Sequence, residues 1–165
     1  MRKEGEKMKM YFRQRVFSWL DSYDVFDDMG QTVYTVQGKL AWGHRLHIHN
    51  LSGEHVATLK EVMLTFLKPR FDMFVGEEKI GTITKELTLF KPKFTLDCND
   101  WQVQGNFWEW DYEIVDGSGH RVAAVNKEIW KLTDTYTIDV ERDEDALYAL
   151  MVVLAIDAEK CSRND

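Results

Sequence analysis

An uncharged apolar run, ALYALMVVLAI, occupies residues 146–156, between the acidic segment ERDED at 141–145 and Asp157. A helix with this sequence has no polar face, so protein or lipid must surround it on every side. At about 1.5 Å per residue the run is roughly 16 Å long, whereas the hydrocarbon core of a bilayer is about 30 Å thick. The run is therefore too short to cross a membrane, and we expect a helix at about residues 143–160 that the rest of the chain encloses.

Residues 11–139 contain short runs of alternating apolar and polar residues separated by turn residues, a pattern typical of β-strands. Two clear examples are TVYTV at 32–36 and LHIH at 46–49. About twelve such runs predict a sandwich or a barrel, and a barrel of that size needs something to fill it. The predicted fold class is therefore mainly β: a closed antiparallel barrel of about twelve strands around a central hydrophobic C-terminal α-helix. A change of phase near Phe107-Trp108 predicts a bulge or turn there.

Length and charge limit the class of protein. A chain of 165 residues fits one domain, and we expect a flexible charged tail at 1–9 and a single domain at 10–162. The tail lacks the apolar stretch of a signal peptide, so we expect a cytoplasmic protein. The formal net charge of −7 argues against a nucleic-acid partner and suits a monomer or dimer. The partner is then an unknown protein or a membrane headgroup.

A Lys-Glu-apolar repeat occurs in three of the expected strands, as TLKEV at 58–62, ITKEL at 83–87 and AVNKEI at 124–129. In each repeat the lysine is expected on the same face of the strand as the apolar residues. In an up-and-down barrel these strands run parallel, so we expect Lys60, Lys85 and Lys127 at one rim. There the stems pack and the ammonium groups reach water. The alternative function of these lysines is a basic ring for an anionic headgroup.

Three phrases resemble a known family: KPKF at 91–94, FWEWDY at 107–112 and VVLAID at 152–157. In this order the chain resembles the LURP-one-related family, its bacterial members above all, over about residues 10–160. The resemblance implies a tubby C-terminal-like fold, with tubby domains and phospholipid scramblases as distant relatives. Most members have no established biochemical activity, so the resemblance predicts a fold and leaves the function open.

Tubby domains bind phosphoinositides through a basic surface, and the resemblance directs attention to basic residues beside aromatic ones. The two Lys-Pro segments of the chain supply them. The headgroup candidates are Lys68, Arg70, Lys91 and Lys93.

Two groups of side chains are candidate metal ligands. Scramblases carry an acidic calcium-binding segment before the corresponding helix, so the resemblance implies a weak calcium site at Asp139, Glu141, Asp143 and Asp145. The spacing is not that of an EF-hand, and capping of the helix by Asp143 or Asp145 is the alternative. His44, His47, His49 and His55 are also close in sequence. His47 and His49 share a strand face, but zinc needs a third ligand.

No catalytic motif is present: GxSxG, HExxH and a phosphate-binding glycine loop are all missing from the sequence. Glu109 and Asp111 project from one strand, yet an interior filled by a helix leaves no deep pocket for a substrate. We therefore expect no enzyme and no cofactor, but a non-catalytic binding or scaffolding module. The alternatives are a peripheral membrane protein that binds anionic, phosphoinositide-like headgroups and, with less support, a scramblase-like or calcium-responsive lipid protein.

Overall fold

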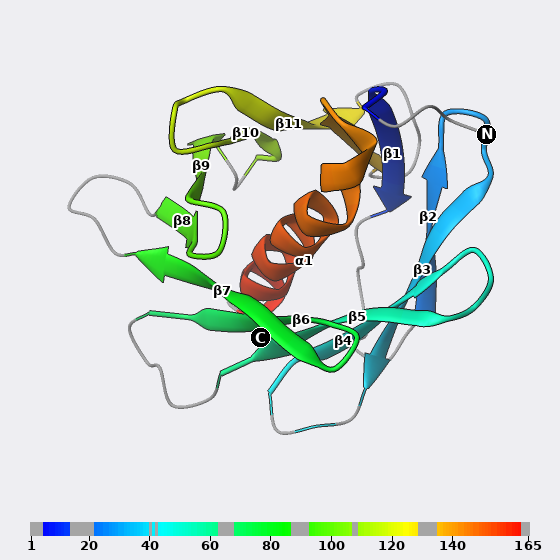
Figure 1. Ribbon diagram of the computed structural model, residues 1–165, viewed down its shortest axis with the longest axis horizontal. Helices are drawn as coiled ribbons and strands as arrows, with labels where there is room; N and C mark the ends of the chain where they lie inside the picture. Colours follow the sequence, from blue (N-terminus) through cyan, green and yellow to red (C-terminus); the bar gives the residue numbers. More distant parts are fainter. Residues whose placement is uncertain are drawn as a thin grey trace.

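The computed structural model describes residues 5–13, 22–39, 41, 43–62, 68–86, 93–106, 109–128 and 135–162. Twelve antiparallel strands form one closed barrel, and a single helix follows them, as Figure 1 shows. The predicted fold class is confirmed. The strands are β1 (Met8–Arg13), β2 (Ser22–Asp27), β3 (Thr32–Lys39), β4 (Arg45–Asn50), β5 (His55–Glu61), β6 (Arg70–Val75), β7 (Glu78–Glu86), β8 (Lys93–Leu96), β9 (Trp101–Asn106), β10 (Asp111–Val115), β11 (Arg121–Glu128) and β12 (Thr135–Val140).

The barrel has an up-and-down order. Each strand pairs with the next one in the chain, and β1 closes the ring by pairing with β12, from Met8 opposite Val140 to Arg13 opposite Thr135. All odd-numbered strands therefore point the same way. We call the end where the even-numbered strands finish the entry rim, and the end where the odd-numbered strands finish the exit rim. Strand β1 begins at Met8, so the first strand starts inside the expected tail.

Aspartates shape the tight turns of the entry rim. The carboxylate of Asp27 accepts hydrogen bonds from the backbone N–H groups of Met29 and Gln31, at 3.0 and 2.9 Å. Asp116 does the same for Ser118 and His120, both at 2.9 Å. Such side-chain-to-backbone bonds are the reason why aspartate is common in turns.

The apolar run forms the core of the barrel. A 3₁₀ turn, η1 (Asp143–Asp145), leads into α1 (Ala146–Ser162), which begins at the entry rim and runs through the ring of strands in Figure 1. Residues 149–159 are all buried, and inward strand residues such as Met10, Ile48 and Ile114 are fully covered. The prediction of an enclosed helix is confirmed. No helix in the described ranges is long and apolar enough to cross a membrane.

The expected helix cap is wrong. The residue before η1 is Arg142, and no side chain caps this end by a hydrogen bond. The carboxylate of Asp143 instead accepts a hydrogen bond from the backbone N–H of Gly5 at 2.9 Å. Asp145 accepts one from Arg142 Nε at 3.0 Å. The 3₁₀ turn stands where a capping residue would be. The two acids therefore bind Gly5 and Arg142 and do not cap the helix.

Candidate functional site

Three cations lie side by side on the outer surface of the barrel. In the antiparallel register Lys39 of β3 is directly opposite Arg45 of β4, and Arg45 is directly opposite Lys60 of β5. Their neighbours Leu46 and Leu59 are buried, so the three cations occupy the outward phase. Lys39 and Lys60 are exposed and Arg45 is half-buried. We call these three residues the cationic row.

No carboxylate of the described residues forms an ion pair with the cationic row. The nearest acid in register is Asp72 of β6, opposite Lys60, but its carboxylate already binds Lys79 Nζ at 2.8 Å. Lys39 Nζ donates a hydrogen bond to the amide oxygen of Gln37 at 3.1 Å, which is a neutral partner. Like charges directly opposite each other on neighbouring strands are destabilising. The row therefore carries uncompensated positive charge that an anion would relieve.

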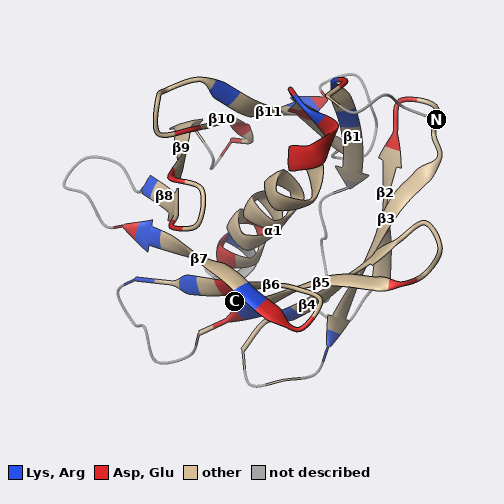
Figure 2. Ribbon diagram, viewed as in Figure 1, with Lys and Arg blue, Asp and Glu red and all other residues tan. Residues whose placement is uncertain are grey.

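Charged segments of both signs occur at both ends of the barrel in Figure 2, but acids are more numerous at the entry rim. The β3–β8 side of the exit rim holds the cationic row together with Lys68, Arg70 and Lys93. Acids are most numerous at the entry rim, in the turns and in η1. The exit rim has Glu109, Asp111 and Glu128 near β10 and β11, and also Glu61 and Glu86, which end β5 and β7 on the side of the basic residues. The entry-rim acids are Asp27, Asp28, Glu54, Glu77, Glu78, Asp97, Asp100, Asp116, Glu141, Asp143, Glu144 and Asp145.

Two of the predicted headgroup residues lie beside the cationic row, and a third, Lys93, lies on β8, three strands away from β5. Lys68 and Arg70 are exposed, and Arg70 begins β6 diagonally across from Lys60. Lys93 is half-buried and directly opposite Glu86 of β7. Lys91 is outside the described residues, as is the expected bulge at Phe107-Trp108. The structure thus extends the predicted basic surface from β6 to β3.

The three repeat lysines do not share one environment. Lys60 points outward, so its predicted apolar phase is wrong; Leu59, and not Lys60, has the inward position of β5. Lys85 points inward as predicted but is fully buried and paired with Glu159 of α1, so it does not reach water at the rim. Lys127 is exposed, and its ammonium group is 6.0 Å from the ring centre of the buried Tyr136. A ring of these three lysines does not form.

The histidines form a cluster on the outer face of β4 and β5. The ring of His47 stacks on that of His55 with centroids 4.5 Å apart, and the ring of His49 lies 5.5 Å from His55. A third imidazole is thus present. In the described residues, however, no group of three metal-ligating side chains has the geometry to hold a metal ion. His44 lies apart from the cluster and contacts Glu61, Nδ1 to Oε2 at 2.7 Å.

Electrostatics distinguishes these two histidine environments. Burial, followed by the charges of His55, Lys39, His49 and Arg45, lowers the pKa of His47. Hydrogen bonding from His44 lowers the pKa of the Glu61 carboxyl. His44 thus has a carboxylate partner, whereas His47 is influenced by positive groups.

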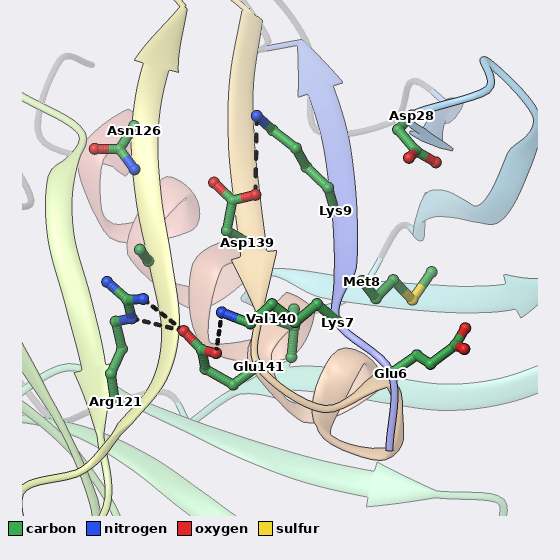
Figure 3. Close-up of a pocket in the computed structure, with 11 residues that line it drawn as sticks. Glu6, Lys7, Met8, Lys9, Asp28, Arg121, Asn126, Asp139, Val140 and Glu141 are labelled. Atoms are coloured by element: carbon green, nitrogen blue, oxygen red, sulfur yellow. Dashed lines mark hydrogen bonds and ion pairs between the residues drawn. The ribbon is translucent and has the colours of Figure 1, made fainter. Parts of the chain in front are cut away.

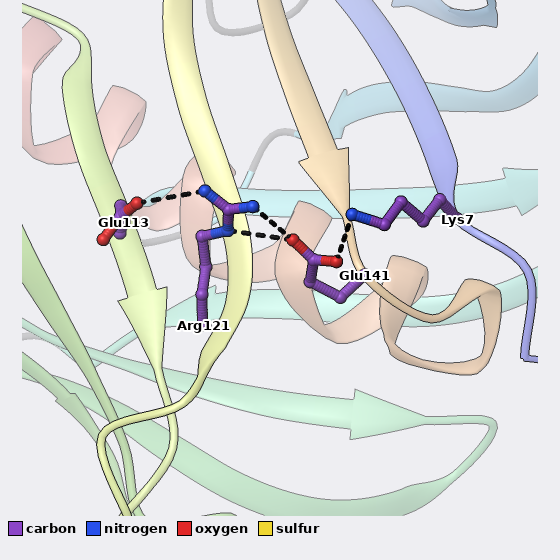
Figure 4. A network of polar contacts seen from close by, with 4 residues as sticks. All are labelled: Lys7, Glu113, Arg121 and Glu141. Atoms are coloured by element: carbon purple, nitrogen blue, oxygen red, sulfur yellow. Dashed lines mark hydrogen bonds and ion pairs between the residues drawn. The ribbon is translucent and has the colours of Figure 1, made fainter.

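The four acids of the calcium hypothesis each have an intramolecular partner, and Figures 3 and 4 show those in the groove. Asp139 lies 3.8 Å from Lys9 Nζ, and Glu141 binds both Lys7 at 2.7 Å and Arg121 at 2.6 Å. Asp143 and Asp145 are engaged at the start of the helix, as described above. These contacts bring no three acids around one point. The two groove acids instead alternate with cations along β1, β12 and β11.

That groove has a volume of about 600 Å³ and lies on the outside of the barrel. Lys7, Lys9 and Arg121 line it together with Glu6, Asp28, Asp139 and Glu141, over a floor that includes Ala124 and Val140. Because the cations are matched by acids, the groove has no strong preference for a ligand of either sign. The carboxylates considered as a catalytic pair, Glu109 and Asp111, are both exposed and flank the buried Trp110. They line neither this groove nor an interior site.

Sequence reasoning missed Lys39 and Arg45. Each stands at the end of a strand, beside Leu40 or Leu46, and neither belongs to a repeat. The pairing register could have found them. If a short turn joins the strands that end at residue 39 and begin at residue 45, these two residues must lie opposite each other. The pairing register also places Lys60 next to Arg45.

Comparison with known proteins agrees with this architecture. The chain is 24% identical over 151 residues to the uncharacterized protein YxjI of Bacillus subtilis (strain 168), which covers 91% of this chain and 92% of that protein. The X-ray structure of a protein from Arabidopsis thaliana has the same fold, with a TM-score of 0.66, 21% identity and coverage of 94% and 93% of the two chains. The LURP-one-related signature matches residues 8–157. This protein therefore belongs to the LURP-one-related family.

Proposed function

We propose that this protein is a non-catalytic binding module that attaches to anionic lipid headgroups through the cationic row. The observation that supports the proposal is the register of Lys39, Arg45 and Lys60, which aligns three cations without an acid partner in the described residues. Lys68 and Arg70 extend the same surface. Because α1 fills the interior of the barrel, a ligand has to bind on the outer surface.

The charge distribution accounts for binding to an anionic surface by a protein of net charge −7. Strands of six to eight residues are roughly 20–25 Å long, at about 3.3 Å per residue. The Debye length at physiological salt is about 8 Å, so the acids of the entry rim are largely screened from a surface that touches the exit rim. Attraction to the membrane therefore depends on the positive charge close to it, and the net negative charge of the whole protein has little effect.

The sequence before two of the basic residues favours lipid over a soluble polyanion. In sequence, the segments that precede Lys68 and Lys91 are MLTFL at 63–67 and LTLF at 87–90. Bulky apolar residues beside basic ones are the composition of segments that lie at a membrane interface. Because the cytoplasmic leaflet carries the anionic lipids, the proposal also fits the expected cytoplasmic location.

Vesicle flotation tests the proposal. Wild-type protein is expected to float with phosphatidylcholine vesicles that contain 20% phosphatidylserine or 5% phosphoinositide at about 100 mM salt, and to lose binding near 500 mM. A Lys or Arg near an anionic surface contributes about 1 kcal/mol, so a triple Lys39→Gln, Arg45→Gln, Lys60→Gln variant should bind roughly 150-fold more weakly.

A matched control separates the position of charge from its amount. Lys7→Gln, Lys9→Gln and Arg142→Gln together remove the same charge from residues that pair with Glu141, Asp139 and Asp145. This variant is expected to float like the wild type. Equal losses in both variants, or no flotation of the wild type at low salt, would contradict the proposal.

A further inference from the structure

The histidine cluster adjoins the cationic row. His47 is the next outward residue after Arg45 on β4, and its ring stacks on that of His55 of β5, which pairs with His49. Their rings are nearly parallel, at 19°, with centroids 4.5 Å apart. His55 Nε2 lies 2.9 Å from the Thr58 hydroxyl, which holds that ring in place. The row and the stacked pair therefore form one surface on three neighbouring strands.

Positive and neutral groups surround His47 on each neighbouring strand. From β3 it faces Gln37, its direct partner, and Lys39. Arg45 and His49 flank it on β4, and from β5 it meets His55 and Thr58, with Lys60 beyond.

The carboxylates of the adjoining elements have other partners. Asp24 of β2 accepts a hydrogen bond from the Thr35 hydroxyl at 2.7 Å. Glu54, in the turn before β5, accepts one from the Asn50 amide at 2.7 Å. Asp72 of β6 binds Lys79. No described carboxylate is thus paired with His47 or His55.

This environment determines how His47 responds to an anion. With the row unoccupied, partial burial and then the surrounding positive groups lower the pKa of His47, so the ring is neutral at neutral pH. A headgroup bound at the cationic row would bring negative charge close to His47, which the positive groups of the row now influence. Protonation of the ring would then be favoured, because an opposite charge nearby stabilises the charged form.

We propose that anion binding at the cationic row is coupled to proton uptake by His47, so that the protein binds anionic surfaces more tightly as the pH falls. The inference rests on the proposed function, whose site it shares. Linkage is reciprocal: a proton that strengthens headgroup binding is itself bound more tightly when the headgroup is present. Each proton taken up changes the dissociation constant by up to about tenfold per pH unit within the titration range.

Binding measurements at two pH values test the coupling. Vesicles of phosphatidylcholine with 20% phosphatidylserine are suitable, because this headgroup keeps its charge between pH 5.5 and 7.5. The dissociation constant of the wild type is expected to fall by at least about fivefold from pH 7.5 to 5.5. His47→Gln with His55→Gln should abolish most of this change. The control, His120→Gln, alters an exposed histidine at the entry rim and should keep the full pH dependence.

Calorimetry provides a second readout that does not depend on comparing affinities. Titration with the same vesicles near pH 6.5 in two buffers of different ionisation enthalpy counts the protons taken up on binding. The wild type should take up protons, and the double histidine variant should take up almost none. Circular dichroism confirms that the variant is folded, which we expect because both side chains point outward.

The outcomes separate the two proposals. Wild-type binding with the same pH dependence and proton uptake in the double histidine variant would overturn the coupling and leave the proposed function intact. No wild-type binding at either pH would overturn the proposed function and the coupling with it. If His120→Gln also removed the pH dependence of binding, the effect would come from overall charge, and a role for the histidine cluster would be refuted.

Discussion

The ion pair between Lys85 and Glu159 allows a quantitative test of how the helix is held in the barrel. The side chain of Lys85 on β7 is fully buried, and that of Glu159 on α1 is only 7% exposed. Replacement of Lys85 by Met removes the cation and leaves a carboxylate inside the barrel. Breaking a buried pair from one side costs about 3–5 kcal/mol, which is a large share of the roughly 5–15 kcal/mol that stabilises a typical domain.

Urea denaturation followed by tryptophan fluorescence measures this cost. With a denaturant slope of about 2 kcal/mol per molar, the midpoint of Lys85→Met should fall by roughly 1.5–2.5 M. Lys79→Met is the control, because Lys79 is exposed and its surface pair with the half-buried Asp72 should be worth less than about 1 kcal/mol. The double variant Lys85→Met, Glu159→Leu should recover most of the loss, since it removes both charges of the pair. A cost below about 1 kcal/mol for Lys85→Met would refute the reasoning.

Two further predictions concern the helix and the His44–Glu61 contact. Val153→Asp places a charge at a fully buried helix position and should lower the free energy of unfolding by more than about 4 kcal/mol. Circular dichroism should show a loss of folded protein. A variant as stable as the wild type would contradict the enclosed helix. Glu61 has a pKa below its unfolded value, so it stabilises the fold above that value and loses this effect as the pH falls through the folded pKa. Thermal denaturation of Glu61→Gln should therefore show a deficit at pH 7 that disappears towards pH 3, and a deficit independent of pH would contradict the contact.

The architecture could be predicted from sequence because burial leaves a local periodic signal. The run that contains Leu150 and Val153 is apolar on every side, and the strands alternate at a period of two. The same logic placed Lys85 on the inner face. It failed for Lys60, because assigning a face requires knowing where the strand ends, and β5 stops at Glu61 before Val62 can take part in the pattern.

The candidate site was less predictable because it is built across strands. Nothing in the sequence around Lys39 or Arg45 marks either residue, and their importance arises only from the register that sets them opposite each other. The same holds for His55, which joins His47 across a strand pair with a shifted register. A single sequence shows which residues share a strand face, but it does not show which residues meet between strands.

Closure of the barrel by β1 and β12 has a consequence for how the chain acquires its structure. Beside this seam, the hydrogen bond between Gly5 and Asp143 joins residues 138 positions apart, and α1 follows all twelve strands in the chain. Contacts of such high sequence separation make folding slow, since the loop must close before the contact contributes. During synthesis the strands emerge before the segment that fills them, with open sheet edges and uncovered apolar faces. Removing α1 would therefore leave an open, aggregation-prone sheet instead of a smaller stable domain.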